Sequence, residues 1–384
     1  MKATEILTYF QDRQPSIIES ICGIVDIESP SHHVERSKQV VAWIENKACE
    51  IKLDLQIQKI FADGYGEHLL IRAFQSGEKG VLMLGHTDTV HPLGTENPTR
   101  IEGGKLYGCG VFDMKANIIL MLEALRYFAE SGEKPQRPIT ILLSCDEEVG
   151  SHTGRPLVEA EAAKSEFCLV FEPSAAGRLK TGRKGTGMFV IKAHGIPAHA
   201  GLEPEKGASA ILELARQIEK IHLLNNAEIG TTANVCVIKG GTASNVIPEN
   251  AECSVDVRFG TMEEAARIEA AVKDLRPFDS RISLQVIGGI NRPPMERTEH
   301  VVALYKKAKD LAASFDYELG ETQVGGASDG NFVGALGIPV LDGLGISGDG
   351  AHTLYEHILL NDIASRAALV TMMLMEDRRI EGGP

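Results

Sequence analysis

In the first half of the chain, short apolar runs alternate with longer segments in which apolar residues recur at helical spacing. The runs end at turn residues or charges, which is typical of strands that are buried on both faces of a sheet. They are GVLMLG (80–85), ITILLS (139–144) and FCLVF (167–171). Between the first two, residues 114–132 carry an apolar helical stripe that ends at Gly132. The alternation predicts an α/β fold with a mainly parallel sheet covered by helices.

The pattern changes after residue 183. It then has four strand-like and two helical segments: strands at 187–195, 231–241, 251–260 and 281–289, and helices at 207–224 and 262–275. Their order, β-α-β-β-α-β, predicts an inserted ferredoxin-like unit. The α/β pattern returns afterwards, with helices near 299–314 and 361–378. We therefore predict a larger domain, residues 1–183 and 292–384, interrupted by a smaller domain at 184–291.

Charge and cysteine content narrow the possible partners and location. The 384 residues include 53 acids and 39 bases, a net charge of −14. This balance argues against nucleic acid or an anionic membrane as a partner, since both need a basic face. The longest apolar run, near 367–375, is too short to span a bilayer. The seven cysteines are scattered without a CxxC, so we expect reduced thiols in a cytoplasmic protein.

Potential metal ligands follow the predicted strands. His86 comes directly after GVLMLG, and Glu172 directly after FCLVF. The run ITILLSC leads into three consecutive acids, which are Asp146, Glu147 and Glu148. His352 follows the strand-like segment IPVLDGLG, and Asp113 stands at the start of the predicted helix. Since ligands bind outside the carboxyl ends of strands in open α/β sheets, these side chains are expected at one edge.

The residue types suit zinc, cobalt or manganese. Taken singly, each has a simpler explanation: a histidine at a strand end is usually a satisfied polar residue, and an acidic triplet is usually a solvated turn. Their coincidence at one sheet edge favours a metal site. Five ligands are too many for one tetrahedral zinc with an open position, but they fit two metals about 3.5–4 Å apart. One acid of the triplet would then bind a cation, and its neighbour would act as a general base.

An ordered set of motifs spans nearly the whole chain. It comprises GHTDTV, GCGVFDMKAN, CDEEVGS, FEPS, GIPAHAG, TASNVIPENAECSVDVRF and GAHTLYE. In this set the chain resembles the M20 family of metallopeptidases, and HAGLEPEKGASAILEL is similar to its glutamate carboxypeptidase (carboxypeptidase G2-like) branch. The resemblance implies a di-zinc α/β peptidase domain with an inserted ferredoxin-like lid that also forms a homodimer.

The resemblance also implies roles for individual residues. Asp113 would bridge the two metals. His86 and Glu172 would complete one site, and Glu148 and His352 the other. Glu147 would be the general base that activates the bridging water. Asp88 would orient the His86 imidazole without itself binding a metal.

Four further residues match positions that contact substrate in the family. His199, reaching over from the partner subunit, would help to hold the substrate carbonyl oxygen. Asn245 and Arg292 would hold the polar ends of the substrate, with Arg292 as a bidentate clamp for a carboxylate. Arg292 also has a structural alternative, in which it ties the two domains together beside Pro293 and Pro294. Arg258 matches a family arginine, but a purely structural role is equally expected.

Together these features predict a cytoplasmic di-zinc hydrolase that cleaves an amide bond next to a free carboxylate, in a small peptide or N-acyl amino acid. A glutamate-type carboxypeptidase is the favoured activity. The alternatives are an M20 N-acyl-amino-acid deacylase, a desuccinylase, or a di- or tripeptidase. A more distant alternative is a non-catalytic, metal-stabilised binding protein. Glu147 disfavours it, because a structural metal site requires ligands but no additional general base.

Overall fold

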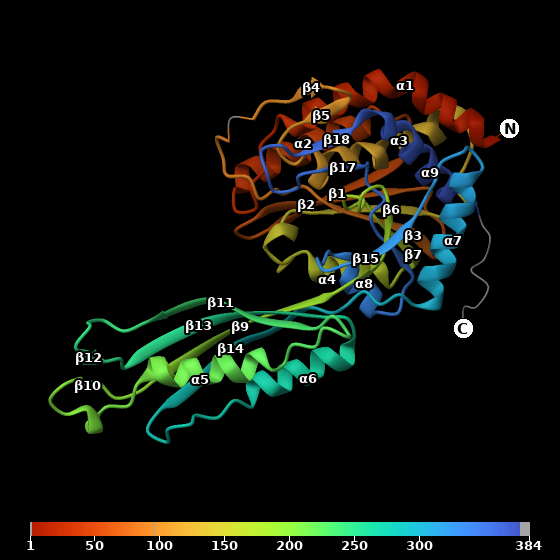
Figure 1. Ribbon diagram of the computed structural model, residues 1–384. Coiled ribbons are helices and arrows are strands. Elements are labelled where there is room, and N and C mark those ends of the chain that lie inside the picture. The colour runs from red at the N-terminus through yellow and green to blue at the C-terminus, as the bar shows by residue number, and fades with distance from the viewer. Residues whose placement is uncertain (1, 96, 377–384) are drawn as a thin grey trace. The chain divides into compact units, whose positions relative to one another are not determined.

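The computed structural model describes residues 2–95 and 97–376 (Figure 1). Contacts between Cα atoms divide the chain into two compact units. The first holds residues up to Gly182, together with Arg297–Gln323 and the chain from Ser328 on. The second holds Arg183–Glu296 and Val324–Ala327. Each unit has its own hydrophobic core.

A six-stranded sheet forms the centre of the first unit. Its strand order is β1 (Leu55–Ala62), β2 (Gly66–Ala73), β6 (Ile139–Ser144), β3 (Gly80–His86), β7 (Ser165–Val170) and β16 (Val340–Leu341). The pairs β6–β3, β3–β7 and β7–β16 are parallel, whereas β1–β2 and β2–β6 are antiparallel. The fold is therefore mixed α/β with a mainly parallel central sheet, and the parallel part consists of the strands predicted from the apolar runs together with the short β16.

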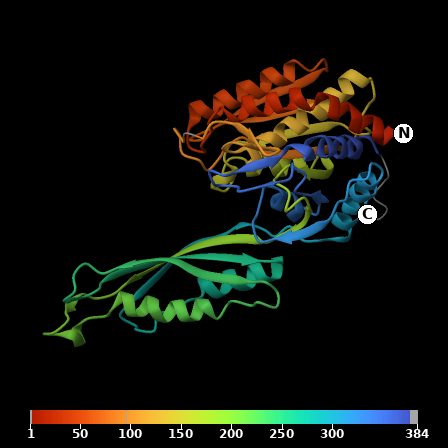
Figure 2. The ribbon, with the colours of Figure 1, turned by 45° about the horizontal axis from the view of Figure 1, so that its top comes forward.

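Helices lie on both faces of this sheet (Figures 1 and 2). On one face α1, α3 and α9 pack against one another, and α2 packs on β2. On the other face α4 and α8 pack against β7, whereas α7 contacts α9 and the edge strand β16 and shares the core of the first face. The bounds are α1 (Lys2–Val25), α2 (Val34–Cys49), α3 (Ala116–Ser131), α4 (Arg155–Ala162), α7 (Glu299–Ala313), α8 (Gly330–Ala335) and α9 (Ile363–Met375). Because helices cover both faces, β3 is buried along nearly its whole length.

Four short strands form a separate small sheet in the first unit. Its order is β17 (Gly348–Asp349), β18 (His357–Leu359), β5 (Lys105–Tyr107) and β4 (Arg100–Glu102). Another pair joins β8 (Leu179–Arg183) to β15 (Glu321–Val324). The small sheet pairs β18 with β5, so that His357 lies opposite Tyr107 although the two are far apart in the sequence.

The helix predicted from residue 114 begins two residues later, at Ala116. A π-type turn, Val111–Lys115, precedes it, and Asp113 and Met114 lie outside helical φ and ψ angles there. The cause is a carboxylate from a distant part of the chain. Glu356 accepts hydrogen bonds from the backbone N–H groups of Phe112 and Asp113, which fixes a non-helical backbone at this point.

The second unit is a four-stranded antiparallel sheet with two helices. Its elements are β9 (Gly185–His194), α5 (Ala210–His222), β11 (Thr232–Gly240), β13 (Asn250–Phe259), α6 (Met262–Lys273) and β14 (Ser283–Arg292). The strand order is β11-β13-β9-β14, and both helices pack on this sheet. Residues of β13 alternate between buried and partly exposed, as expected for a sheet with one covered face. A small pair, β10 (Ala198–His199) and β12 (Val246–Ile247), extends from it. The use of this unit as a lid stays a prediction.

Within residues 2–95 and 97–376, none of the helices combines the length and the apolar character that crossing a bilayer requires.

Candidate metal centre

The five residues predicted as metal ligands lie together in the first unit. His86 is the last residue of β3, and its Nε2 lies 3.1 Å from Asp113 Oδ1 and 3.5 Å from Glu172 Oε1. His352 Nε2 lies 3.4 Å from Asp113 Oδ2 and 3.3 Å from Glu148 Oε2. Both oxygens of Asp113 therefore face an imidazole, and the two imidazoles come from different segments. This arrangement suits a carboxylate that bridges two cations.

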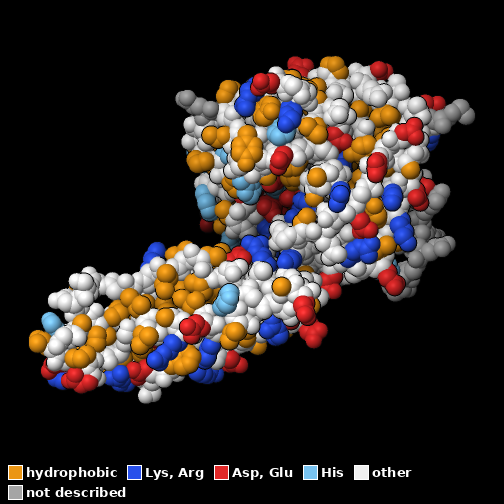
Figure 3. All heavy atoms as spheres, viewed as in Figure 1, with side chains coloured by type: hydrophobic (Ala, Val, Ile, Leu, Met, Phe, Trp, Pro, Cys, Tyr) orange, Lys and Arg blue, Asp and Glu red, His pale blue; other side chains and the backbone are white. Residues whose placement is uncertain are grey.

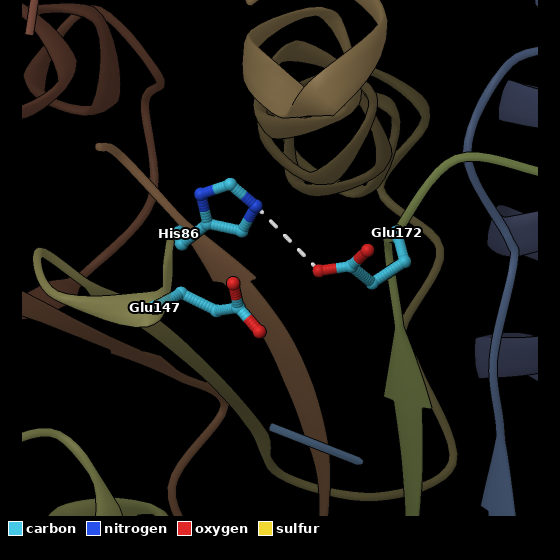
Figure 4. Close-up of side chains that lie close together, drawn as sticks. All are labelled: His86, Glu147 and Glu172. Atoms are coloured by element: carbon cyan, nitrogen blue, oxygen red, sulfur yellow. Dashed lines mark ion pairs between the residues drawn. The ribbon is translucent and has the colours of Figure 1, made fainter. Parts of the chain in front are cut away.

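Ligand atoms of this cluster form two groups in which all atoms lie within 4.8 Å of one another. One group is His86, Asp113 and Glu148, and the other is His86, Glu147 and Glu172. In Figure 4, Glu172 and Glu147 point into the same space beside the His86 imidazole. The donors are all imidazole nitrogen and carboxylate oxygen, which zinc, cobalt and manganese accept.

One oxygen of Glu148 supports a cation at this place. Among the described residues, Glu148 Oε1 is buried and has no hydrogen-bond partner. A buried carboxylate oxygen without a partner is costly, so such an atom calls for a donor or a cation. The residues of the cluster therefore fit the divalent metals that the sequence predicts.

Charge coupling within the cluster shifts several pKa values. Burial opposes ionisation of Asp113, but hydrogen bonds from His352 and His86 outweigh it and lower the pKa of the carboxyl. The hydrogen bonds to Asp113 and Glu148 raise the pKa of His352 to about 10. Burial raises the pKa of Glu148. The acids thus hold protons on the imidazoles, and a divalent cation would compete with those protons for the same nitrogen and oxygen atoms.

Asp88 organises the backbone of the site. The closest contact of His86 Nδ1 is the Asp88 backbone oxygen at 2.9 Å, and the Asp88 carboxylate lies 3.5 Å away. An Nδ1–H donated to that carbonyl leaves the Nε2 lone pair for a metal. The Asp88 carboxylate in turn accepts the backbone N–H groups of Glu147 at 3.2 Å and Glu148 at 3.1 Å. Asp88 therefore holds the loop that carries both acids.

Glu356 is a supporting residue for which the sequence gives no role. It is fully buried and accepts N–H groups from Gly110, Phe112 and Asp113 at 2.8, 2.8 and 2.9 Å. His91 Nε2 lies 2.9 Å from the same carboxylate. Apart from being an acid in GAHTLYE, Glu356 gives no signal in the sequence, because its partners lie about 240 positions away.

The four predicted substrate residues all belong to the second unit. His199 lies on β10, and its Nδ1 accepts the backbone N–H groups of Gly201 and Leu202 at 3.2 Å each. Its proton therefore sits on Nε2, where it can be donated. The backbone oxygen of Asn245 accepts the N–H of Ala200, so the Asn245 and His199 segments lie side by side.

The two arginines of this set differ in their surroundings. Arg258 donates two hydrogen bonds to Asp256 on the same strand, at 3.0 and 2.8 Å, which favours its structural role. Arg292 is the last residue of β14 and is buried. A buried guanidinium can bind a carboxylate with two parallel hydrogen bonds.

Comparison with known proteins identifies the family. Residues 82–376 match the model of peptidase family M20/M25/M40. The chain belongs to this family. Carboxypeptidase G2 of Pseudomonas sp. (strain RS-16) is 28% identical over 380 residues, covering 95% of this chain and 90% of the relative. Succinyl-diaminopimelate desuccinylase of Alkalilimnicola ehrlichii is 31% identical over 329 residues, covering 78% and 84%. The chain is thus an M20 metallohydrolase.

Solved structures support the same fold. Aminopeptidase PepT from Bacillus cereus superposes with a TM-score of 0.78 at 23% identity, covering 94% of this chain and 98% of that one. The M20 family metallo-carboxypeptidase Sso-CP2 from Sulfolobus solfataricus gives 0.71 at 15% identity, with coverage of 94% and 98%. The family resemblance predicted from the motifs is confirmed, and so is the prediction that the chain is a hydrolase.

Proposed function

We propose that this M20 metallohydrolase is a carboxypeptidase-type enzyme that cleaves an amide bond next to a free C-terminal carboxylate, with a glutamate-type residue as leaving group. The observation that carries the proposal is the acid Glu147 beside the His86 cluster, in addition to the five proposed ligands. A site that only stabilises a fold needs ligands but no extra carboxylate. A catalytically idle, metal-stabilised binding protein is therefore disfavoured.

Two zinc ions are the proposed cofactors. His86, Asp113 and Glu172 would hold one, and Asp113, Glu148 and His352 the other. When bound, the metals would supply a water of lowered pKa and would polarise the scissile carbonyl group. Cobalt and manganese accept the same donor types and are the alternatives.

The chain's own residues then account for the proton transfers. Glu147 takes a proton from the water that adds to the carbonyl carbon, and returns it to the nitrogen as the C–N bond breaks. The products are a carboxylic acid and an amine. His199, with its proton on Nε2, would donate a hydrogen bond to the carbonyl oxygen, where negative charge develops. Asn245 would hold another polar group of the substrate.

The carboxylate end of the substrate is assigned to Arg292. Metal ions attract any anion, so they do not select a substrate by the position of its carboxylate. A guanidinium held in a fixed position, which donates two parallel hydrogen bonds, does select a substrate by the position of its carboxylate. Arg258 is the weaker candidate because its side chain is 35% exposed to water, whereas Arg292 is buried.

Sister activities within the family are the alternatives. Relatives of this chain are named succinyl-diaminopimelate desuccinylase as well as carboxypeptidase G2. An N-acyl-amino-acid deacylase, a desuccinylase, or a di- or tripeptidase would use the same metals and the same base. They differ in the groups that hold the two ends of the substrate.

We further propose a cytoplasmic homodimer that forms through the second unit, which would also act as a lid. The seven cysteines are all free thiols, which suits a reducing compartment. Val237 and Ile238, on the edge strand β11, and Leu212 on α5 are exposed apolar residues. Unpaired edges and exposed apolar residues favour pairing with a second copy.

A hydrolysis panel tests the proposed activity. Peptides and N-acyl amino acids with free or amidated carboxyl groups are incubated with the zinc-, cobalt- or manganese-loaded protein. We expect turnover of free acids, preferably with C-terminal glutamate, and its loss on chelation. Full activity in a chelator-treated, metal-free sample would refute the mechanism. Faster turnover of succinyl or tripeptide substrates would favour the sister activities.

A further inference from the structure

The first unit contains a groove of about 450 Å³ beside the metal cluster. Its walls are residues 30–33, residues 89–90 and residues 148–149, and it is called the side groove below. Glu148 lines the side groove and also belongs to the proposed ligand set, so the two sites adjoin. The volume is typical of a site for a small molecule or for one part of a substrate. In Figure 3, histidine and apolar side chains of the first unit surround a hollow that contains acidic side chains.

Hydrogen bonds join the walls of the side groove to the segment that carries His86. The N–H of Thr89 donates to the Ser29 backbone oxygen at 2.9 Å, and Pro30 forms a β-bridge with Thr89. Asp88 Oδ2 accepts both the Ser31 hydroxyl at 2.7 Å and the Glu148 N–H at 3.1 Å. One carboxylate oxygen therefore connects two walls of the groove to the strand end that holds His86. A group bound there would sit at a fixed position relative to the cluster, without ordering a loop first.

Most of the exposed lining is apolar, although Ser31, His32, His33, Thr89 and Glu148 add polar atoms. Pro30, Val90 and Val149 supply aliphatic surface, and the Val90 side chain is 40% exposed. The imidazole of His32 packs against the ring of Tyr65, with centroids 5.1 Å apart. Among the described residues that line the groove, none is a lysine or arginine, and the acid Glu148 stands at its metal side. Such a surface offers an anionic group no lysine or arginine as a partner, and its aliphatic area favours a neutral apolar or aromatic group.

We propose that the side groove binds the acyl part of the substrate and selects neutral apolar or aromatic acyl groups over anionic ones such as succinyl. The inference rests on the proposed amide hydrolysis. The end that bears the free carboxylate is assigned to the guanidinium of Arg292, and no lysine or arginine lines this groove. The groove is thereby left for the opposite end, on the carbonyl side of the scissile bond. The relatives named succinyl-diaminopimelate desuccinylase are named for an anionic succinyl group, so the acyl preference proposed for this chain differs from the one that their name indicates.

Two substitutions at Val90 test the chemistry of the groove. The substrates share one amino acid, the best of the hydrolysis panel, and carry acetyl, hexanoyl, benzoyl or succinyl as the acyl group. For the native enzyme we expect kcat/KM for the benzoyl and hexanoyl compounds to exceed that for acetyl by about tenfold or more. V90W fills the groove, so this advantage should fall by about tenfold, while acetyl changes little. V90K adds a cation, so the ratio of succinyl to benzoyl turnover should rise by about tenfold.

Ile101 supplies the matched controls. It is an apolar residue of β4 in the same unit, is 56% exposed, and does not line the side groove. I101W and I101K should leave the kcat/KM ratios among the four compounds unchanged. Metal content and circular dichroism establish that each variant is folded and loaded. If V90K does not fold, H32A removes the aromatic wall without adding charge, and benzoyl turnover should then fall more than hexanoyl turnover.

Binding to E147Q separates this inference from the proposed function. Calorimetry with zinc-loaded E147Q and E147Q/V90K measures affinity for the benzoyl and succinyl compounds without turnover. If V90K raises the affinity for the succinyl compound relative to the benzoyl compound, the acyl-binding role of the groove is supported. Absence of hydrolysis of every panel substrate would refute only the proposed activity. Acyl ratios that stay constant in folded, metal-loaded V90W and V90K overturn the inference. So does a native enzyme that prefers succinyl to benzoyl.

Discussion

Glu147 and Glu148 are neighbours in the sequence, but they are expected to have different roles, Glu147 as general base and Glu148 as metal ligand. Glu148 Oε2 contacts His352, and burial raises the pKa of this acid. Glu147 lies near His86 and Glu172. We predict that E147Q keeps both metals and loses turnover by about 10²–10⁴-fold, as for a lost general base. E148Q should lose metal as well.

Metal analysis of the two variants decides this point. A Glu147 oxygen lies within 4.8 Å of donor atoms of His86 and Glu172, so an E147Q protein that loses one equivalent of metal would reassign Glu147 as a ligand. An E147Q protein with both metals and near-native kcat would show that the base is another residue.

Arg292 and Arg258 offer a second residue-level comparison. If Arg292 clamps the substrate carboxylate, R292A should cost about 2–5 kcal/mol in kcat/KM for the free acid, because a buried charge loses its partner. The loss should be smaller for the C-terminal amide, so the acid-to-amide ratio falls. R258A should leave that ratio unchanged, since Arg258 is already paired with Asp256. Equal slowing of acid and amide by R292A would indicate a purely structural arginine.

Single residues were predictable from sequence where a buried run pointed to them. His86 and Glu172 directly follow apolar strands, and parallel strands deliver such residues to one edge. Glu356 was not predictable in this way. Its partners Gly110 and Asp113 lie far away in the chain, and nothing local marks an acid as the acceptor for them. Supporting residues of this kind require the tertiary structure.

At the scale of elements, apolar runs predicted β3, β6 and β7, but the hairpin β1–β2 was missed. A signal for it exists: Asp63–Gly64 separates two strand-like segments, and Gly64 has a φ of 79°. Apolar and polar residues alternate at the start of β1, from Leu55 to Gln58, but the strand has no continuous apolar run of the kind that predicted β3, β6 and β7. The predicted start of the following helix, at residue 114, was also wrong. The helix begins at Ala116, because Glu356 binds the backbone N–H of Asp113 and prevents a helical backbone there.

Gly288 in β14 carries an element-level prediction. Its φ is +100°, and a Cβ there would lie 2.2 Å from the Met188 backbone oxygen on the neighbouring strand β9. Backbone strain at such a φ costs about 1–3 kcal/mol, and the clash adds to it. We expect G288A to lower the unfolding temperature of the second unit by calorimetry. The neighbour Gly289 is the control, because its Cβ would meet only the end of the Glu269 side chain. Equal effects of G288A and G289A would contradict this reason.

At the scale of the whole molecule, the residues proposed for metal binding and those proposed for substrate binding fall in different units of the chain. The proposed metal ligands all belong to the first unit, whereas His199 and Arg292 belong to the second. The first unit has a donor set for metals and a base, whereas the arginine proposed for the substrate carboxylate lies in the second unit. The proposed mechanism therefore requires both units, and in the proposed two-fold dimer the second unit of one protomer would serve its partner.

Complementation between two inactive variants tests whether His199 acts across the dimer. H199A lacks the donor to the carbonyl oxygen, and E147Q lacks the base, so each homodimer should be nearly inactive. In a mixed dimer, the site with the native Glu147 lies in the H199A subunit and receives the intact His199 of the E147Q subunit. One site of two is then complete. Random pairing of coexpressed subunits makes half of the dimers mixed, so about one quarter of native activity should return. If His199 served its own subunit, every site would lack one group and no activity would return. Sedimentation of the active protein as a monomer would contradict the dimer itself.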